Sequence, residues 1–449
     1  MQKPTLEQCQ ITIRTFPLRT CYIWIAIRCI LHVSPIRYRL ADSDCMDSEL
    51  AVFDIATVPN DSPVGYFIEC DLHYPPHLHD LHNAYPLAPE HVKIEESMLS
   101  DTLRFMLDET NTKHTSSTKL VTNLYDKTHY VTHYRCLQFY LKHRLELIKV
   151  HQVIAFNQSR YMLPFIKFCN DGRKNAQSDF ESSLYKLIAN TFYGKTVENV
   201  RKCSNIRLIA DEKRFVRTVA KATYKRSAII NDQLALVENM NVKILLCKPI
   251  AVGCTILEIA KFIMHQFYYD CLLPKFGDRL HMCFTDTDSF ICHIQSEDLV
   301  GELVDIAVQW LNTSNFEREH PLYSDANFRV LGKFKSGMAD VAPVEFCGVR
   351  SKMYSLSTLG STKDYHKAKG VSKTFVKQNV RHERYLDVLR YWTKTSCSYL
   401  AFRLWNHRVV TLRHEKVCLS CIDDKRHLLL DCIHSLAYGH YSIMDDACA

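Results

Sequence analysis

The chain has 449 residues, of which 47% are hydrophobic, and a formal net charge of +7. These values exclude a wholly disordered chain and predict a large core in two or three subdomains. Its 19 cysteines show no framework spacing, which argues against a disulfide-stapled secreted protein and indicates reduced thiols inside the cell.

The positive charge is concentrated in one segment. Residues 331–380 hold nine Lys and Arg but only three acids. Such an excess favours a polyanionic partner whose binding weakens as salt rises. A solvated basic face explains the charge equally well.

The first 40 residues differ from the rest, with six basic residues and a single acid, Glu7. Their apolar run, residues 22–33, is too short to span a bilayer, and we expect no membrane contact. Two interpretations stay open: an organelle-targeting leader, or a segment without a role in the fold.

Residues 65–73 alternate between two faces and predict a strand. Residues 75–89 form a Pro- and His-rich loop, a weak metal set because no Cys or carboxylate accompanies it at fixed spacing. Residues 109–118 predict a polar linker and residues 120–149 a helix. A break is expected at residues 170–172, Asn-Asp-Gly.

A second helix is predicted over residues 178–195. Lys186, Asn190 and Tyr193 are spaced i, i+4 and i+7 on it, so they share one face. The lysine is suited to a phosphate and the ring to a sugar and base, which makes a nucleoside triphosphate a candidate ligand. An ordinary exposed polar face is the alternative.

Residues 254–272 carry the clearest apolar helical pattern. A polar knot, residues 285–289, then lies between two short apolar runs and predicts a β-hairpin with Asp286 and Asp288 at its tip. Two aspartates two positions apart would share one face of a strand. They are tolerated in solvent or beside a divalent cation. Another helix is predicted over residues 297–311.

Downstream, residues 332–335 and 349–356 predict strands with alternating basic residues. Together with nearby aromatic residues they suit a surface that follows a nucleic-acid backbone. Cys418 and Cys421, with Cys432 and His427, could form a zinc site, although ordinary buried thiols are the simpler interpretation.

Three of these elements, in this order, resemble motifs of family B DNA polymerases. Residues 186–194 are similar to the Lys-x3-Asn-Ser-x-Tyr-Gly fingers helix, residues 284–289 to the Tyr-x-Asp-Thr-Asp-Ser palm hairpin, and residues 352–354 to the Lys-x-Tyr motif. The overall likeness is to the type 2, protein-primed polymerases of viruses, linear plasmids and self-synthesising (Maverick/Polinton-type) transposons. Four further blocks resemble the transposon branch of these polymerases. These blocks are residues 65–75, 78–90, 423–426 and 438–440.

The resemblance covers about residues 50–449 and implies an α+β, right-hand polymerase fold. We expect a palm with an antiparallel sheet, helical fingers and a thumb, without an exonuclease domain. The implied division is a non-matching leader (1–48), a partial palm with a priming-associated insertion (49–135), fingers with the preceding palm segment (136–203), a palm with the Asp hairpin (204–300), and the palm end with the thumb (301–449).

The resemblance also implies roles for individual residues. Asp286 and Asp288 would be the catalytic ligands of two Mg²⁺ ions that activate the primer 3′-hydroxyl and hold the triphosphate. The nucleotide would be bound by Arg173, Lys174, Lys186, Asn190 and Tyr193. Primer and DNA would be bound by Lys333, Lys335, Lys352, Tyr354, Lys367 and Lys369. The implied partners are a DNA primer-template, deoxynucleoside triphosphates and a terminal protein primer.

The sequence departs from the family at the first palm aspartate, which residues 1–64 do not supply. Asp71 imitates that motif, but its surroundings match a later strand. Thr191, Phe284 and Ser336 also replace expected residues. We therefore expect an N-terminally truncated polymerase with weakened DNA synthesis, in the nucleus rather than in mitochondria. The alternative is an inactive remnant that binds DNA or nucleotide. A metal-dependent nuclease is disfavoured because it needs no triphosphate cradle.

Overall fold

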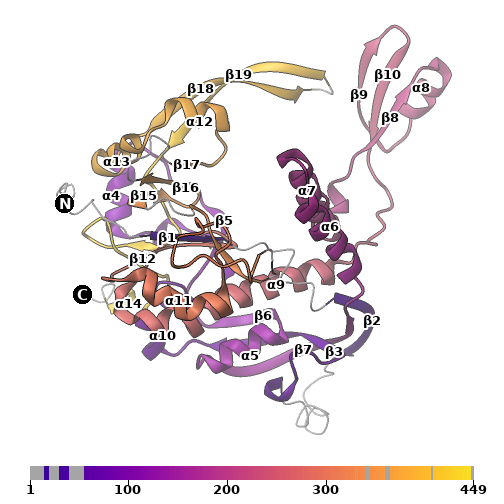
Figure 1. Cartoon of the computed structure of the whole chain (residues 1–449). Helices are drawn as coiled ribbons and strands as arrows, with labels where there is room; N and C mark the ends of the chain where they lie inside the picture. Colours follow the sequence, from indigo (N-terminus) through magenta and orange to yellow (C-terminus); the bar gives the residue numbers. More distant parts are fainter. Residues whose placement is uncertain are drawn as a thin grey trace.

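The computed structural model describes residues 55–445 except 329, 331, 339–342, 359–364 and 406–407, together with the backbone of 15–19 and 30–39. Helices and mainly antiparallel sheets are mixed throughout, as predicted. Figure 1 shows a broad body from which the α6–α7 pair, the β8–β10 unit and the β18–β19 ribbon project. Most of the predicted leader lies outside the described residues, but its stretches 15–19 and 30–39 are strands β1 and β2.

A four-stranded antiparallel sheet forms one side of the body, in the order β2-β7-β3-β6. Its strands are β2 (Ile30–Arg39), β3 (Val64–His73), β6 (Lys127–His133) and β7 (Glu146–Ser159). The predicted strand over residues 65–73 is confirmed as β3. Its face of Ile68, Cys70 and Leu72 is buried, as the alternation indicated.

The helix predicted over residues 120–149 is wrong. The structure has the end of β5 (Ser117–Val121), then β6, a nine-residue α5 (Tyr134–Lys142) and the start of β7. Val121, Thr128 and Thr132 belong to a segment rich in β-branched residues, which fit a pleated surface better than a helix. Pairing of β6 with β3 then settles the conformation.

The insertion after β3 is a set of short elements. These are α3 (His79–His82), β4 (Glu90–Ile94) and α4 (Asp101–Glu109), with β4 paired to β5. The C-terminal tail docks onto this insertion: Arg426 donates from both terminal nitrogens to Asn83, at 3.0 Å to its carbonyl and 2.9 Å to Oδ1. Two blocks far apart in sequence are therefore held together in the fold.

Two helices, α6 (Leu163–Asn175) and α7 (Asp179–Thr196), form an antiparallel pair. The helix predicted over residues 178–195 is confirmed as α7, with Ser178 accepting from the Glu181 amide at 3.2 Å. The break predicted at residues 170–172 is wrong, because α6 continues through them. Gly172 serves close packing instead: a Cβ there would lie 2.4 Å from the Tyr185 ring.

A small unit follows α7 and carries its own sheet, in the order β8-β10-β9. It consists of β8 (Asn205–Ile209), α8 (Glu212–Val219), β9 (Tyr224–Asn231) and β10 (Leu234–Asn239). Ile209 and Val237 are buried while much of the remaining apolar surface, such as Leu208 and Ile229, is exposed. The unit therefore has only a thin core.

Helix α9 (Ile250–Phe267) runs through the body and continues into a π turn (Tyr268–Leu272) and α10 (Leu273–Phe276), which confirms the helix predicted over residues 254–272. The stretch Ile250–Arg279 is long and apolar enough to cross a membrane by length and composition alone, but 50% of its most apolar window is buried inside the molecule. A helix packed between sheets has the same composition, so this is weak evidence for a span.

The central sheet has five strands in the order β11-β12-β1-β14-β13. These are β11 (Leu280–Thr285), β12 (Ser289–Ile294), β1 (Thr15–Arg19), β14 (Phe334–Ser336) and β13 (Leu311–Asn312). The predicted hairpin and the predicted helix, α11 (Leu299–Trp310), are both confirmed. Phe267, Phe290 and Phe334 are fully buried beneath this sheet, with the rings of Phe267 and Phe334 centred 4.1 Å apart.

The C-terminal third begins with a sheet of β15 (Pro343–Arg350), β16 (Met353–Thr358) and β17 (Tyr365–Ala368). The single strand predicted over residues 349–356 is wrong, since Ser351 and Lys352 form the turn between β15 and β16. The remaining elements are α12 (Lys373–Asn379), α13 (His382–Tyr391), the β18 (Thr395–Trp405) and β19 (Arg408–Leu419) ribbon, β20 (His427–Leu428), β21 (Ser435–Leu436) and α14 (Tyr441–Asp445).

Candidate functional site

The two predicted aspartates lie in the tight turn between β11 and β12. We call residues 286–288 the aspartate turn. The Asp286 amide donates to the Ser289 carbonyl at 3.0 Å, and the Ser289 amide donates back at 3.2 Å. Thr287 has φ 56°, a left-handed conformation that a β-branched residue rarely adopts. Because both aspartates belong to the turn, the expectation based on alternation along a strand does not apply.

A second hairpin meets the aspartate turn. Lys352, at the tip of β15–β16, places Nζ 3.0 Å from Asp286 Oδ1. Tyr354, two residues on, lies against Phe284 with ring centroids 4.5 Å apart. Lys352 also has a left-handed backbone, with φ 62°. Two of the three motifs that the sequence analysis singled out are thus in direct contact.

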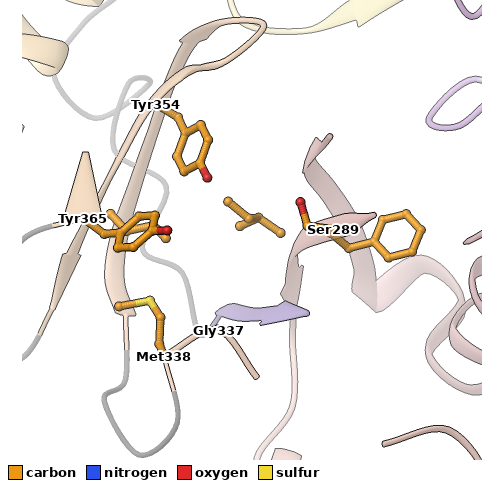
Figure 2. Close-up of a pocket in the computed structure, with 8 residues that line it drawn as sticks. Ser289, Gly337, Met338, Tyr354 and Tyr365 are labelled. Carbon is orange, nitrogen blue, oxygen red and sulfur yellow. The ribbon is translucent and has the colours of Figure 1, made fainter. Parts of the chain in front are cut away.

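A small pocket lies between these hairpins. Figure 2 shows Tyr354, Tyr365 and Met338 on one side of it and Ser289 on the other. Tyr354 and Leu356 belong to a buried apolar cluster with Ile291 and Phe346, so the two hairpins share one packed interface. This packing fixes the position of Lys352 relative to the turn.

The strand beside the hairpin is β1, which pairs with β12 so that Arg19 is opposite Ser289. The β1 sequence, Thr-Phe-Pro-Leu-Arg, has no acidic residue. This strand therefore supplies no carboxylate next to the aspartate turn.

Asp71, which imitates the missing motif, and the nearby Glu69 lie on β3 in the other large sheet. Asp71 accepts from the His129 amide at 2.8 Å and is 2.7 Å from His151 Nε2, and these contacts lower the pKa of Asp71. Glu69 contacts His129 Nδ1 at 2.8 Å. Both carboxylates are therefore engaged by histidines of neighbouring strands.

The donor set can be compared with the needs of Mg²⁺. Within the part of the chain that the structure describes, no group of three or more His, Cys, Asp or Glu side chains is arranged to hold a metal ion. Cys418, Cys421 and Cys432 are buried free thiols. Mg²⁺, however, often uses only one or two carboxylates together with substrate phosphates. The aspartate turn therefore fits one such ion, whereas a second would need further ligands.

The predicted nucleotide residues lie elsewhere, on the α6–α7 pair. Lys186 and Asn190 are exposed on α7, and Tyr193 is half-buried, which raises its pKa. Arg173 and Lys174 are in the last turn of α6. The C-terminal end of α7 packs on α9: a Cβ at Gly253 would lie 2.6 Å from Oγ1 of Thr196, the last residue of α7. Figure 1 shows the α6–α7 pair projecting from the body that contains β12, the second strand of the hairpin with the aspartate turn.

The predicted DNA-contacting lysines differ in their surroundings. Lys333 donates to the carbonyls of Gln309 and, at 3.3 Å, Val308, so it caps the end of α11, and burial lowers its pKa. Lys335, Lys367 and Lys369 are exposed. Lys367 lies 5.5 Å from the centre of the Tyr365 ring. Lys333 is thus committed to a helix end, whereas the other three are accessible.

The sequence analysis missed a second basic region. Residues 200–226, most of the β8–β10 unit, hold nine Lys and Arg against Asp211 and Glu212. The Arg408 side chain, at the tip of the β18–β19 ribbon, donates to the Ile229 carbonyl of this unit at 2.9 Å. A count of charge along the sequence in short windows would have found the basic excess, but not the contact.

Comparison with known proteins supports the architecture. No protein-family model matches the sequence, and no curated protein matches it by sequence. Among solved structures, phi29 DNA polymerase bound to primer-template DNA is similar over 93% of this chain, with a TM-score of 0.50 and 14% identity. The orthorhombic crystal form of that polymerase has a TM-score of 0.51 and 13% sequence identity over 93% of this chain. Its ternary complex with DNA and incoming nucleotide has a TM-score of 0.50 and 12% identity, also over 93% of this chain.

This chain spans about three fifths of the length of those polymerases, with 60%, 61% and 60% of them covered. At such low identity the likeness concerns the fold alone. The fold is therefore a mixed helix-and-sheet arrangement similar to that of a DNA polymerase.

Proposed function

We propose that this chain binds a DNA primer-template and a deoxynucleoside triphosphate and transfers the nucleotidyl group to the primer 3′-hydroxyl, with release of pyrophosphate. The observation that carries the proposal is the contact of Lys352 with Asp286 in the aspartate turn and of Tyr354 with Phe284 on the strand before it. Motifs more than sixty residues apart meet there, within a fold similar to that of a DNA polymerase.

In this proposal Asp286 and Asp288 hold Mg²⁺. The bound ion would neutralise phosphate charge and lower the pKa of the primer hydroxyl. Lys352 and Tyr354 would fix the primer end, because Lys352 contacts Asp286 and Tyr354 packs on the β11 strand that leads into the turn. Lys335, Lys367 and Lys369 would contact the DNA backbone as accessible point charges.

The nucleotide would be held by α6 and α7. Lys186, with Arg173 and Lys174, would neutralise the triphosphate, and Asn190 and Tyr193 would border the sugar and base. The resemblance to the protein-primed branch adds four further parts to the proposal. These are a terminal protein primer, a second Mg²⁺ ion, an origin in a transposable element and a nuclear location.

A second candidate function is binding of DNA or nucleotide without turnover. It is favoured by β1, which adjoins the hairpin and carries no acid. Loss of one metal-binding carboxylate from a polymerase would remove several kcal/mol of transition-state stabilisation, hence orders of magnitude in rate.

Primer extension distinguishes the two candidates. The full chain is incubated with Mg²⁺, a primer-template and four dNTPs, beside Asp288→Ala. Synthesis predicts extension that falls by about a hundredfold or more in the variant. DNA affinity in EDTA is measured in parallel. Binding with no extension supports the second candidate, and absence of both contradicts the proposed function.

A further inference from the structure

The ion pair between Lys352 and Asp286 joins two groups that the proposed function assigns to different ligands. Lys352 would serve the primer strand and Asp286 a divalent cation, yet they lie 3.0 Å apart. The Thr287 hydroxyl donates to the same Oδ1 atom at 2.7 Å. This oxygen thus already has a cation and a hydroxyl donor.

Both partners are accessible enough to exchange. Their side chains are 47% and 33% exposed, for Lys352 and Asp286 respectively. A pair this exposed is weak, commonly worth no more than about 1 kcal/mol, so ligands can displace it. Both lie in hairpin tips with a left-handed residue, Thr287 in one and Lys352 itself in the other. Such strained backbone tends to occur where a segment must present a side chain.

A divalent cation and the Lys352 ammonium compete for Asp286, because two cations beside one carboxylate oxygen repel each other. A DNA phosphate and Asp286 compete in turn for Lys352, which has one charge and three donors. Tyr354 holds this hairpin against Phe284 whichever partner Lys352 takes. The lysine can therefore change partner by side-chain rotation alone.

We propose that Lys352 is an exchangeable counter-ion, which neutralises Asp286 in the free protein and moves to a DNA phosphate on binding, so that Asp286 becomes available to a divalent cation. This rests on the proposed function of the same site. DNA and the cation then bind with positive coupling, and linkage makes that coupling reciprocal. The free protein is held in a state that disfavours the cation.

The first experiment measures Mn²⁺ affinity without DNA, from the electron paramagnetic resonance signal of free Mn²⁺. Lys352→Met, which keeps the length of the side chain, should bind Mn²⁺ about two- to fivefold more tightly than the wild-type chain. The gain should vanish in an Asp286→Asn background. Lys373→Met, an exposed lysine on α12, removes the same charge elsewhere and should leave the affinity unchanged.

The second experiment measures affinity for a fluorescent primer-template in EDTA. Asp286→Asn should bind DNA about two- to fivefold more tightly, because Lys352 no longer has to leave a carboxylate. Lys352→Met should reduce the slope of log affinity against log salt by about one. In the Lys352→Met background, Asp286→Asn should give no gain in DNA affinity.

The outcomes separate this inference from the proposed function. An equal gain from Asp286→Asn with and without Lys352 would mean simple charge repulsion and would overturn the exchange. Unchanged Mn²⁺ affinity in Lys352→Met would also overturn it. A wild-type chain that binds no DNA would contradict the proposed function, and the inference with it. DNA binding that Asp286→Asn leaves unaltered contradicts the inference alone.

Discussion

The aspartate turn and the exposed face of α7 each carry a short polar motif, but the fold holds them in opposite ways. At the turn, Lys352 contacts Asp286 and Tyr354 packs on Phe284, so the side chains restrain one another. On α7, Lys186 and Asn190 extend into solvent. The first arrangement is organised by the protein itself. In the second, the side chains of Lys186 and Asn190 are accessible from solvent.

The physical basis of this difference is where each motif makes its apolar contacts. The hairpins share the cluster of Ile291, Phe346 and Leu356, which leaves little room for movement. Helix α7 buries only Ala189 and Thr196 fully and carries exposed Phe180, 77% accessible. Mutations should therefore affect stability at the turn and ligand binding at α7.

The largest expected effect is on stability at the turn. Tyr354→Ala removes a ring that is 7% exposed and opens a void beneath Phe284. We expect a loss of about 3–5 kcal/mol in the free energy of unfolding, measured by urea denaturation. Tyr354→Phe keeps the ring and should lose less than half as much. Equal losses in the two variants would show that packing is not what holds the hairpins together.

Two buried histidines should make the stability of the folded chain depend on pH. His82, in α3, lies against the Tyr269 ring and His133, at the end of β6, against the Phe67 ring, and burial lowers the pKa of each to about 3. Each is neutral when folded, whereas the unfolded chain takes up a proton near pH 6.5. Stability is therefore full above pH 6.5 and falls by about 1.4 kcal/mol per histidine per pH unit below it.

Thermal unfolding at pH 7.5, 6.5 and 5.5 measures this dependence. The melting temperature should be level between the first two values and fall at the third. A flat profile down to pH 5.5 would mean that these histidines are not buried in neutral form.

On α7 the expected effect is on ligand affinity. Lys186→Met should raise the KM for dNTP about 10- to 100-fold, the loss of a charge-assisted contact to phosphate, with the melting temperature unchanged. Lys195→Met on the same helix removes a lysine that pairs with Glu198 at 2.7 Å and should leave KM as it was. If the two variants behave alike in steady-state kinetics, the face of Lys186 has no special role.

The smallest expected effect is a gain in stability from a substitution in the aspartate turn. Thr287→Gly relieves a left-handed backbone at a β-branched residue and should stabilise the chain by up to about 1 kcal/mol. Thr287→Ala retains the positive φ without the hydroxyl and should not stabilise it. Calorimetry of the two variants would decide, and a destabilised glycine variant would show that the turn is not strained.

The sequence by itself determined the elements whose signals are local. Apolar periodicity located α9, helices were also predicted at the positions of α7 and α11, and the polar knot between apolar runs located the hairpin with Asp286 and Asp288. The order of the three motifs indicated a polymerase-like fold. These predictions succeeded because helical spacing and turn composition depend on residues a few positions apart.

Only the tertiary structure decided the features that depend on distant partners. Pairing with β3 made β6 a strand where a helix was predicted, and Gly172, expected to break a helix, lies inside α6 and leaves room for the Tyr185 ring of α7. Lys352 is a hairpin tip and not a strand residue, which is why it reaches Asp286. The physical reason is common to all three: the deciding contact joins residues that are separate in the chain, and no local pattern records it.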